Sequence, residues 1–177
     1  KSEPNDPNAA SLATSNKNNF PSVRVILLKD FNQNGFAFYT NLNSQKGKEL
    51  KENPKAAMCF HWKSLSRQIR INGTAKQLTE EVADQYYNSR GYESRIGAWA
   101  SKQSEVISTR EELLNSIKEY KKKYSDQNKI PRPSYWSGWN LFPLSIEFWL
   151  DGDNRIHERL KYTKDLNGQW IKSLLSP

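Results

Sequence analysis

The sequence predicts a mainly β protein with helices (an α+β chain), built as an antiparallel β-barrel with helices packed outside it. Most of the 177 residues fall into short runs of strand character that follow one another in hairpin order. The Asn34-Gly35 pair between two such runs is a strong signal for a tight turn. A few segments with helix-capping residues are inserted between the strands.

The expected strands are short runs rich in β-branched and aromatic residues. The turn at Asn34-Gly35 makes residues 22–40 a hairpin. The later runs predict a second strand pair in the middle of the chain and three closing strands at its end. In chain order, the expected ranges are 9–14, 22–29, 36–41, 55–62, 67–78, 144–152, 155–163 and 169–175.

Three segments have helix signals, and each opens with a Ser or Thr that can cap free backbone N–H groups. The first ends at Pro54, and the second has two acidic residues in its first turn, where the helix dipole favours them. The third opens with "STRE", a capping box in which Glu111 pairs with Ser108. The expected helices cover 44–54, 79–90 and the segment from Ser108 through "LLNSIKEYKKK".

The charge of the chain favours anionic partners. It contains 27 Lys+Arg against 19 Asp+Glu, a formal charge of +8, which suits nucleic acid, an acidic membrane or phosphorylated small molecules. Six Trp, eight Tyr and seven Phe argue against disorder. The apolar fraction is only 36%, so a partner subunit or a cofactor is expected to complete the burial. The length suits one domain over residues 1–177, of which 1–8 are expected to be flexible.

Several classes of site are excluded. A single cysteine, Cys59, rules out an internal disulfide and a multi-cysteine metal site, and with two histidines and no HExxH no metal is expected. Neither GxGxxG nor GxxxxGK[ST] occurs, so a Rossmann or P-loop site is not expected. No RNP motif, zinc finger or helix-turn-helix signature supports nucleic acid. Without a membrane-spanning run or a signal-peptide pattern, we expect no membrane partner and a cytoplasmic location.

The stretch "NRIHERL" places both arginines of the segment around one of the two histidines. In a β-strand, Arg155, His157 and Arg159 would stand on one face, because residues two apart point the same way. Two fixed cations beside an imidazole repel one another, so this row predicts an anionic ligand.

Two further groups could hold a phosphate. Lys46 and Lys48 lie near the start of a helix, where free N–H groups favour anions, although a solvated helix face is the simpler explanation of these two residues taken alone. Tyr86 and Arg90 are four residues apart on one helix face and Ser94 lies just beyond, so the three could clasp a phosphate dianion. The competing interpretation is a packed tyrosine beside a solvated arginine.

Two other segments offer candidate ligand contacts. In "GAWASKQS" (97–104), Gln103 and Ser104 are possible donors, although a loop without a ligand is equally plausible. Phe148 and Trp149 are adjacent on a strand, so one is expected to pack in the core while the other could stack on a planar ring.

Eight motifs occur together in a familiar order: "RVILLK", "FYTN" followed by "SQKGKEL", "RQIRI", "YYNSRGYES", "IGAWASKQS", "YWSGW", "IEFW" and "RIHER". From about residue 8 to its end, the chain resembles the pyridoxamine 5′-phosphate oxidases. Members are homodimers with FMN at the subunit interface. They oxidise pyridoxamine or pyridoxine 5′-phosphate to pyridoxal 5′-phosphate, with O2 as acceptor and H2O2 as product. The resemblance implies an FMN-binding split β-barrel, an antiparallel Greek-key-like barrel in which residues 131–177 form the closing strands and the dimer-related part.

The resemblance also assigns roles to residues. It implies FMN contacts at Arg24, Val25, Ile26, Leu27, Tyr39, Thr40, Gln45, Lys46, Gln68, Gln103, Ser104, Trp149 and Arg159. It implies that the substrate phosphate is bound by Lys29, Tyr86, Arg90 and Ser94. It places Arg155 and His157 over the pyridine ring, as substrate-binding and catalytic residues. From this we infer that Arg155 holds the ring and assists removal of its ionisable proton, and no unique base is assigned.

Two departures from the family pattern bear on ligand binding. Gln45 stands where an arginine commonly precedes the lysine, which removes one phosphate donor, and Gly91 replaces a proline after Arg90, which loosens the phosphate loop. The alternatives are another split-barrel FMN oxidoreductase, such as a phenazine-pathway oxidase or a flavin reductase, and a non-catalytic flavin-binding protein. The complete substrate-phosphate set favours the oxidase.

Overall fold

The structure is a computed structural model that describes residues 3, 4 and 6–177. These residues form two compact units. The first comprises the chain up to Phe38 together with Glu49–Lys76 and Asn140–Pro177, and the second comprises Tyr39–Lys48 and Gln77–Trp139. A single domain over residues 1–177 stays a prediction.

The N-terminal residues 1–8, expected to be flexible, are described in part. Residues 1, 2 and 5 lie outside the described residues. Glu3 is buried, and its Oε2 accepts hydrogen bonds from the backbone N and the Oγ of Ser64 at 3.0 and 2.6 Å. Flexibility of this segment therefore also stays a prediction.

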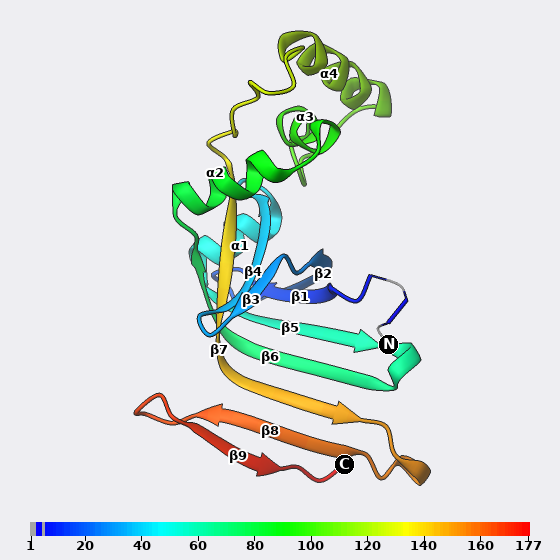
Figure 1. The fold of residues 1–177 in the computed structure, drawn as a ribbon, viewed down its shortest axis with the longest axis vertical. Coiled ribbons are helices and arrows are strands. Elements are labelled where there is room, and N and C mark those ends of the chain that lie inside the picture. Colours follow the sequence, from blue (N-terminus) through cyan, green and yellow to red (C-terminus); the bar gives the residue numbers. More distant parts are fainter. Residues whose placement is uncertain (1–2, 5) are drawn as a thin grey trace. The chain divides into compact units, whose positions relative to one another are not determined.

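A nine-stranded sheet over the described residues forms the framework of the first unit (Figure 1). Its order is β2-β1-β5-β6-β7-β4-β3, with β8 paired to β7 and β9 to β8. The pairs β1–β2, β1–β5, β3–β4, β5–β6, β7–β8 and β8–β9 are antiparallel, as predicted. The strands are β1 (Ala9–Ser15), β2 (Pro21–Leu27), β3 (Asp30–Asn32), β4 (Gly35–Asn41), β5 (Lys55–Trp62), β6 (Arg67–Gln77), β7 (Trp136–Leu150), β8 (Glu158–Lys164) and β9 (Trp170–Leu174).

The core of this unit follows from side-chain alternation along the strands. Leu12 of β1 lies opposite Met58 of β5, and both are almost completely buried. Phe38, Ile71 and Leu141 add fully buried side chains from β4, β6 and β7. Each such side chain contributes about 1.5–3 kcal/mol on burial, so the inward face fixes the strand register.

The tight turn at Asn34-Gly35 is confirmed, but the predicted hairpin over 22–40 is wrong in its extent. The turn joins β4 only to the short β3, whereas β2 pairs with β1. Gly35 has φ +131°, and a Cβ there would meet the carbonyl oxygen of Leu141 at 2.3 Å. The turn is therefore restricted to glycine by both conformation and space.

Two helices agree with the sequence prediction, and a third begins one residue later than expected. Helix α1 (Gln45–Glu52) is capped by Ser44, whose Oγ accepts from Gly47 N at 3.3 Å, and α2 (Glu80–Ser89) by Thr79. In α4 (Arg110–Lys123) the cap is Thr109, not Ser108, and its Oγ1 accepts from Glu112 N at 3.4 Å. The carboxylate that returns to the backbone is Glu112, not Glu111, and it accepts from Ser108 N at 3.2 Å.

Helix α3 (Tyr92–Ala100) was not predicted, because its N-cap residue is Gly91, which has no capping side chain. Its stability comes from packing instead. Ile96 and Ala100 are buried, and α3 lies against α4 in the second unit (Figure 1). Tertiary burial commonly decides helix formation where local signals are weak. Among residues 3, 4 and 6–177, no helix has the length and apolar character needed to traverse a bilayer.

The closing strands differ from the prediction at their starts. Strand β7 begins at Trp136 rather than at residue 144, and its early part was missed because Gly138 and Pro143 weaken a strand pattern. Strand β8 begins at Glu158 rather than at residue 155. The residues before it form a short 3₁₀ turn, Asp153–Arg155.

Replacing Gly91 by proline is expected to stabilise the protein by about 0.4–1 kcal/mol, because proline restricts the unfolded chain. Gly91 has φ −59°, close to the value that proline requires, and a Cβ there meets nothing within 4 Å. Arg90 before it is extended, with φ −78° and ψ 146°, which suits a residue preceding proline. Urea unfolding measures the change. Gly97→Pro, also in open space but inside α3, serves as the control and is expected to destabilise by about 3 kcal/mol. A loss of stability in Gly91→Pro would contradict the expectation.

Candidate active site

A cationic cluster lies where β4 ends and α1 begins. Lys46 Nζ donates to Thr40 Oγ1 at 3.2 Å and to Gln103 Oε1 at 3.4 Å, and Thr40 Oγ1 donates to Gln103 Oε1 at 3.0 Å. Lys46 and Thr40 are buried, with 8% and 5% of their surface exposed. A buried ammonium and a hydroxyl at a helix N-terminus have the charge and donors that a phosphate monoester requires. The three residues brought together here all belong to the predicted FMN set.

A second cluster in the same unit combines stacked aromatic rings with a guanidinium. The rings of Tyr39 and Tyr86 stack at 3.9 Å, and Trp136 stacks on Tyr39 at 5.5 Å. The guanidinium of Arg90 lies over the Trp136 ring at 4.6 Å, a cation–π contact. In the described part of the chain, the buried Arg90 Nη1 has no hydrogen-bond partner. A buried cationic donor without a partner is what a ligand phosphate would satisfy.

Burial also alters the acid–base properties of this cluster. It lowers the pKa of Arg90, and the nearby Tyr86 and Tyr87 act in the opposite direction. Guanidinium groups nevertheless stay protonated in proteins. Burial raises the pKa of Tyr87 to about 12, and its hydroxyl donates to the carbonyl of Arg95 at 3.0 Å. The cluster therefore keeps a positive charge and a neutral phenol over the ordinary pH range.

The position of Trp136 is fixed by Arg132, a residue that no sequence pattern singles out. Arg132 Nη1 donates to the Trp136 carbonyl at 2.7 Å, its Nε donates to Asp84 Oδ1 at 2.6 Å, and it also pairs with Glu80. Its side chain is only 7% exposed. The two carboxylates lie on α2, the helix that carries Tyr86, so Arg132 ties the tryptophan ring to the same helix.

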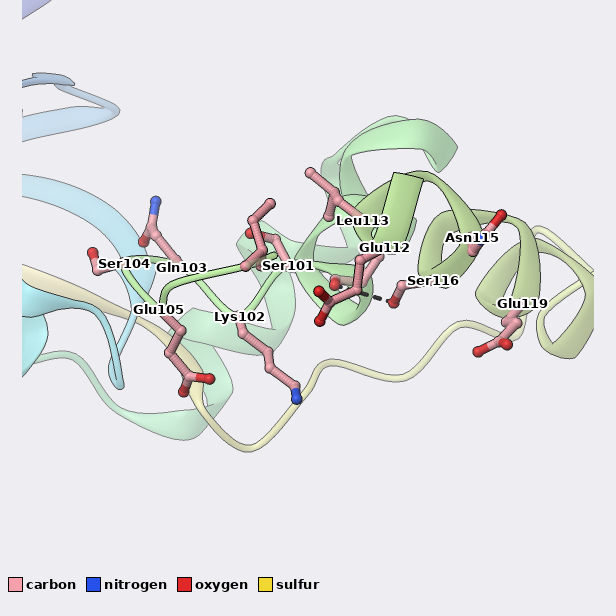
Figure 2. Close-up of a pocket in the computed structure, with 12 residues that line it drawn as sticks. Ser101, Lys102, Gln103, Ser104, Glu105, Glu112, Leu113, Asn115, Ser116 and Glu119 are labelled. Atoms are coloured by element: carbon pink, nitrogen blue, oxygen red, sulfur yellow. Dashed lines mark hydrogen bonds between the residues drawn. The ribbon is translucent and has the colours of Figure 1, made fainter. Parts of the chain in front are cut away.

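Other predicted residues of the second unit lie at its surface. Gln45 is exposed in the first turn of α1, Ser94 is exposed in the first turn of α3, and Ser104 is exposed with φ +72°. Figure 2 shows Gln103 and Ser104 on the loop beside a cavity of about 500 Å³ that α4 also lines. The charged residues that line this cavity are Lys102, Glu105, Glu112 and Glu119. Such a mainly acidic lining does not suit a phosphate.

In the first unit, the predicted row of Arg155, His157 and Arg159 on one strand face is wrong. Only Arg159 belongs to β8. Asn154 and Arg155 have φ +54° and +65°, so the chain turns sharply before the strand begins. A Cβ on Gly152 would meet the Ile156 carbonyl at 2.1 Å, which shows how tightly the turn closes.

His157 instead packs against a predicted cofactor residue. Its ring lies 4.7 Å from that of Trp149, and its Nδ1 lies 3.0 Å from Asp151 Oδ1. Trp149 is half-buried, whereas Phe148 is 42% exposed and meets Tyr162 edge-on. The expectation that one of these adjacent aromatic residues packs in the core is therefore wrong, and stacking of Trp149 on a planar ligand ring stays a prediction.

Arg159 is held by a buried carboxylate that the sequence did not reveal. Glu147 Oε1 accepts from Arg159 Nε and Nη2 at 2.9 and 2.8 Å, and its Oε2 accepts from Arg70 Nη1 at 3.2 Å. Glu147 is 7% exposed. Arg159 Nη1 also donates to the Ser176 carbonyl at 2.9 Å. The available signal was that Glu147 is a charged residue inside an otherwise apolar run of β7.

Arg24 is likewise paired within the sheet unit. Its Nη2 lies 3.3 Å from Glu49 Oε2 and donates to Ser22 Oγ at 2.5 Å. Beyond Arg24, the side chains of Val25 and Leu27 are exposed on β2, Ile26 is half-buried, and Lys29 is exposed after the strand. Among the predicted FMN residues on β2, Arg24 is therefore the one whose side chain is paired within the sheet unit, and its partner is Glu49.

Gln68 lies on β6, and its Oε1 accepts from Cys59 Sγ at 3.4 Å. Burial raises the pKa of the Cys59 thiol, and the charge of Arg70 opposes the shift. The thiol is therefore protonated at neutral pH and is a poor nucleophile.

Two family models match consecutive parts of the chain. Residues 1–124 match the pyridoxamine 5′-phosphate oxidase model, and residues 136–177 match the C-terminal dimerisation region of pyridoxine 5′-phosphate oxidase. The chain belongs to the pyridoxamine 5′-phosphate oxidase family. The resemblance noted from eight motifs is thereby confirmed.

Relatives and solved structures agree with membership of this oxidase family. A pyridoxine/pyridoxamine 5′-phosphate oxidase from Pelagibacter ubique (strain HTCC1062) is 74% identical over 177 residues, covering 100% of this chain and 85% of the relative. PhzG from Burkholderia lata 383, solved in complex with tetrahydrophenazine-1-carboxylic acid, has a TM-score of 0.91 and 32% identity, over 97% of this chain and 83% of PhzG. A pyridoxamine 5′-phosphate oxidase-related, FMN binding protein from Nostoc punctiforme has a TM-score of 0.79 at 15% identity, over 98% of this chain and 90% of the other, and supports the fold. The predicted fold class, the split β-barrel of this family, is confirmed.

Proposed function

We propose that this chain is an FMN-dependent oxidase that converts pyridoxamine or pyridoxine 5′-phosphate to pyridoxal 5′-phosphate, in vitamin B6 biosynthesis and salvage, with O2 as acceptor and H2O2 as product. The observation that carries the proposal is the presence of two phosphate-directed clusters in one unit, one around Lys46 and one around Arg90. A cofactor monoester and a phosphorylated substrate require two such clusters. The full-length relative at 74% identity bears the name of this activity.

For the cofactor, Lys46 and Thr40 would bind the FMN phosphate, with Gln103 fixing both. Arg159, oriented by Glu147, would supply a cation at the flavin. The chemistry that FMN would supply when bound is to accept a hydride from the substrate. A positive charge near a flavin stabilises its reduced, anionic form, which is the role we assign to Arg159.

For the substrate, Arg90 would donate its unpaired Nη1 to the phosphate, together with Tyr86 and Ser94. The cation–π contact with Trp136 holds the guanidinium in place while the phosphate is absent. Arg155 would hold the pyridine ring and favour loss of its ionisable proton, and His157 would bind beside the reacting carbon. These assignments rest on the family pattern together with the clusters described above.

The enzyme is a homodimer, and FMN at the subunit interface is part of the proposal. Residues 136–177 match a dimerisation region. Within it, Trp170, Ile171 and Leu174 of β9 are 42, 54 and 81% exposed. Apolar side chains of this size are costly to leave in water, so a second copy of the chain is expected to cover them. This accounts for the lean core inferred from the composition.

The domain organisation of the chain and its location in the cell also belong to the proposal. We propose one domain over residues 1–177, in which 131–177 form the closing, dimer-related part. We also propose a cytoplasmic location, in keeping with the single cysteine and the site for intracellular phosphorylated compounds. Limited proteolysis of the dimer tests the first proposal, and cell fractionation tests the second.

The test of function is the visible spectrum of the protein loaded with FMN, before and after anaerobic addition of pyridoxamine 5′-phosphate. Bleaching of the flavin band, with recovery in air and formation of H2O2, is the expected result. A bound flavin that the substrate does not bleach would favour another activity of the fold, such as that of a phenazine enzyme. A protein that binds no flavin would exclude the proposal.

Replacing Arg155 by alanine is expected to lower kcat by about 10²–10³-fold and to leave FMN bound, because the lost cation acts on the reacting ring. Steady-state kinetics and the flavin content of the purified variant measure both effects. Arg67→Ala removes an exposed arginine from the start of β6 and is the control. Release of FMN from Arg155→Ala, with normal turnover after reloading, would show that Arg155 serves the cofactor instead.

A further inference from the structure

The imidazole of His157 has two partners at a single nitrogen. Its Nδ1 lies 3.0 Å from Asp151 Oδ1 and 3.3 Å from the backbone N of Gly152. The carboxylate can only accept a proton from Nδ1, whereas the Gly152 N–H can only donate to a lone pair there. The two hydrogen bonds are therefore mutually exclusive, and each corresponds to a different tautomer of the ring.

The distances and charges favour the carboxylate. A hydrogen bond to an ionised group is roughly twice as strong as one between neutral groups, and the contact with Asp151 is also the shorter of the two. With the proton on Nδ1, a neutral His157 has its lone pair on Nε2. The second nitrogen of the ring is then the atom available to a ligand.

The fold holds this pair together through the tight turn before β8. The turn places residue 151 beside residue 157, and it closes so tightly that only glycine fits at position 152. Asp151 N donates to the Ser66 carbonyl at 3.0 Å, which anchors the turn to the sheet. The Trp149 ring packs on the imidazole at 4.7 Å, so the ring plane is restrained as well.

Other charged groups surround the ring without occupying its Nδ1 contact. His157 lines a cavity of about 530 Å³ in the first unit. The charged residues that line it with His157 are Glu158, Arg159 and Lys172, and Arg155 precedes them in the turn. Among the described residues, Asp151 is the one whose carboxylate oxygen lies at hydrogen-bonding distance from His157 Nδ1.

We propose that Asp151 is a positioning residue that keeps the His157 proton on Nδ1 and so presents Nε2 to the substrate. The role in turnover rests on the proposed oxidase function, whereas the tautomer does not. Asp151 does not touch the reacting atoms in this scheme. It acts by fixing which nitrogen of His157 can accept a proton or a hydrogen bond.

The first test reads the tautomer directly. The chain has two histidines, His61 and His157, so long-range ¹H–¹⁵N NMR spectra of the histidine-labelled holoenzyme contain two ring systems, which His61→Gln assigns. At a pH where the ring is neutral, His157 is expected to carry its proton on Nδ1. In Asp151→Ala it is expected to move to Nε2, as Gly152 N–H takes over at Nδ1. Asp151→Asn, which keeps the size of the side chain, is expected to give an intermediate mixture.

The second test separates positioning from structure. Asp153→Asn removes the same charge from the same turn and is expected to leave the tautomer and kcat unchanged. Asp151→Ala is expected to lower kcat by about 10²-fold, the lower end of what a positioned acid–base group contributes, with little change in KM. An unchanged His157 tautomer in Asp151→Ala, or an equal change in Asp153→Asn, would overturn the proposal. A tautomer that shifts as expected in a protein that does not oxidise pyridoxamine 5′-phosphate would support the pairing and refute the oxidase function.

Discussion

Replacing Arg90 by methionine is expected to raise the KM for pyridoxamine 5′-phosphate by about 10- to 100-fold while FMN stays bound. Hydrogen bonds to charged groups contribute about 1.5–3 kcal/mol, and each 1.4 kcal/mol corresponds to about a factor of ten. Methionine preserves the packing on Trp136 but has no donor for a phosphate. Steady-state kinetics give KM and kcat, and flavin absorbance gives the cofactor content.

The change in KM caused by Arg90→Met has to be compared with the change in FMN content, because the comparison shows which ligand Arg90 binds. Arg110→Met removes an exposed arginine at the start of α4 in the same unit and is expected to change neither KM nor FMN content. If Arg90→Met left KM unchanged but weakened FMN, the cluster around Trp136 would serve the cofactor. The assignment of the two phosphate clusters would then have to be reversed.

Replacing Glu147 by alanine is expected to destabilise the protein by about 3 kcal/mol and to weaken FMN binding. Removing one partner of a buried ion pair typically costs about 3–5 kcal/mol, and the lower end applies because Arg70 is half exposed, at 49%. Arg159 would lose the carboxylate that orients it. Urea unfolding of the apoprotein measures the stability, and fluorescence titration with FMN measures the affinity.

Two variants distinguish the charge of Glu147 from its hydrogen bonds. Glu147→Gln keeps one acceptor of similar size and is expected to fall between the wild type and Glu147→Ala in both measurements. Glu158→Ala removes an exposed carboxylate beside Arg159 and is the control. Normal stability and normal FMN affinity in Glu147→Ala would mean that Arg159 needs no partner to keep its position.

The strands and most helix caps could be predicted because their signals are local. The strand at 55–62 agrees with the structure at both ends, and the caps at Ser44 and Thr79 are confirmed. Helix α3 could not be predicted, because its N-cap is a glycine and it depends on burial of Ile96 against neighbouring segments. Such contacts are not visible in a window of sequence.

The residue types of the candidate site could be predicted from the sequence, whereas their arrangement in space could be predicted only in part. The grouping of Tyr86 with Arg90 followed from helical spacing, and both lie in one aromatic cluster. The prediction that Arg155 and His157 lie on one strand face was wrong, because a tight turn, not a strand, precedes β8. Arg132 was missed since its acidic partners lie 48 and 52 residues away in the chain, beyond any local pattern.

Strand β4 sets a limit on how this enzyme can vary. Tyr39 stacks in the aromatic cluster and the next residue, Thr40, belongs to the Lys46 cluster, so successive side chains of one strand join two different clusters from opposite faces. Inserting or deleting one residue upstream in β4 would exchange the two faces and remove both contacts together. Loops in this chain can therefore change in length over evolutionary time, whereas β4 can change only by substitution. Any redesign for a new phosphorylated substrate must keep the length of this strand.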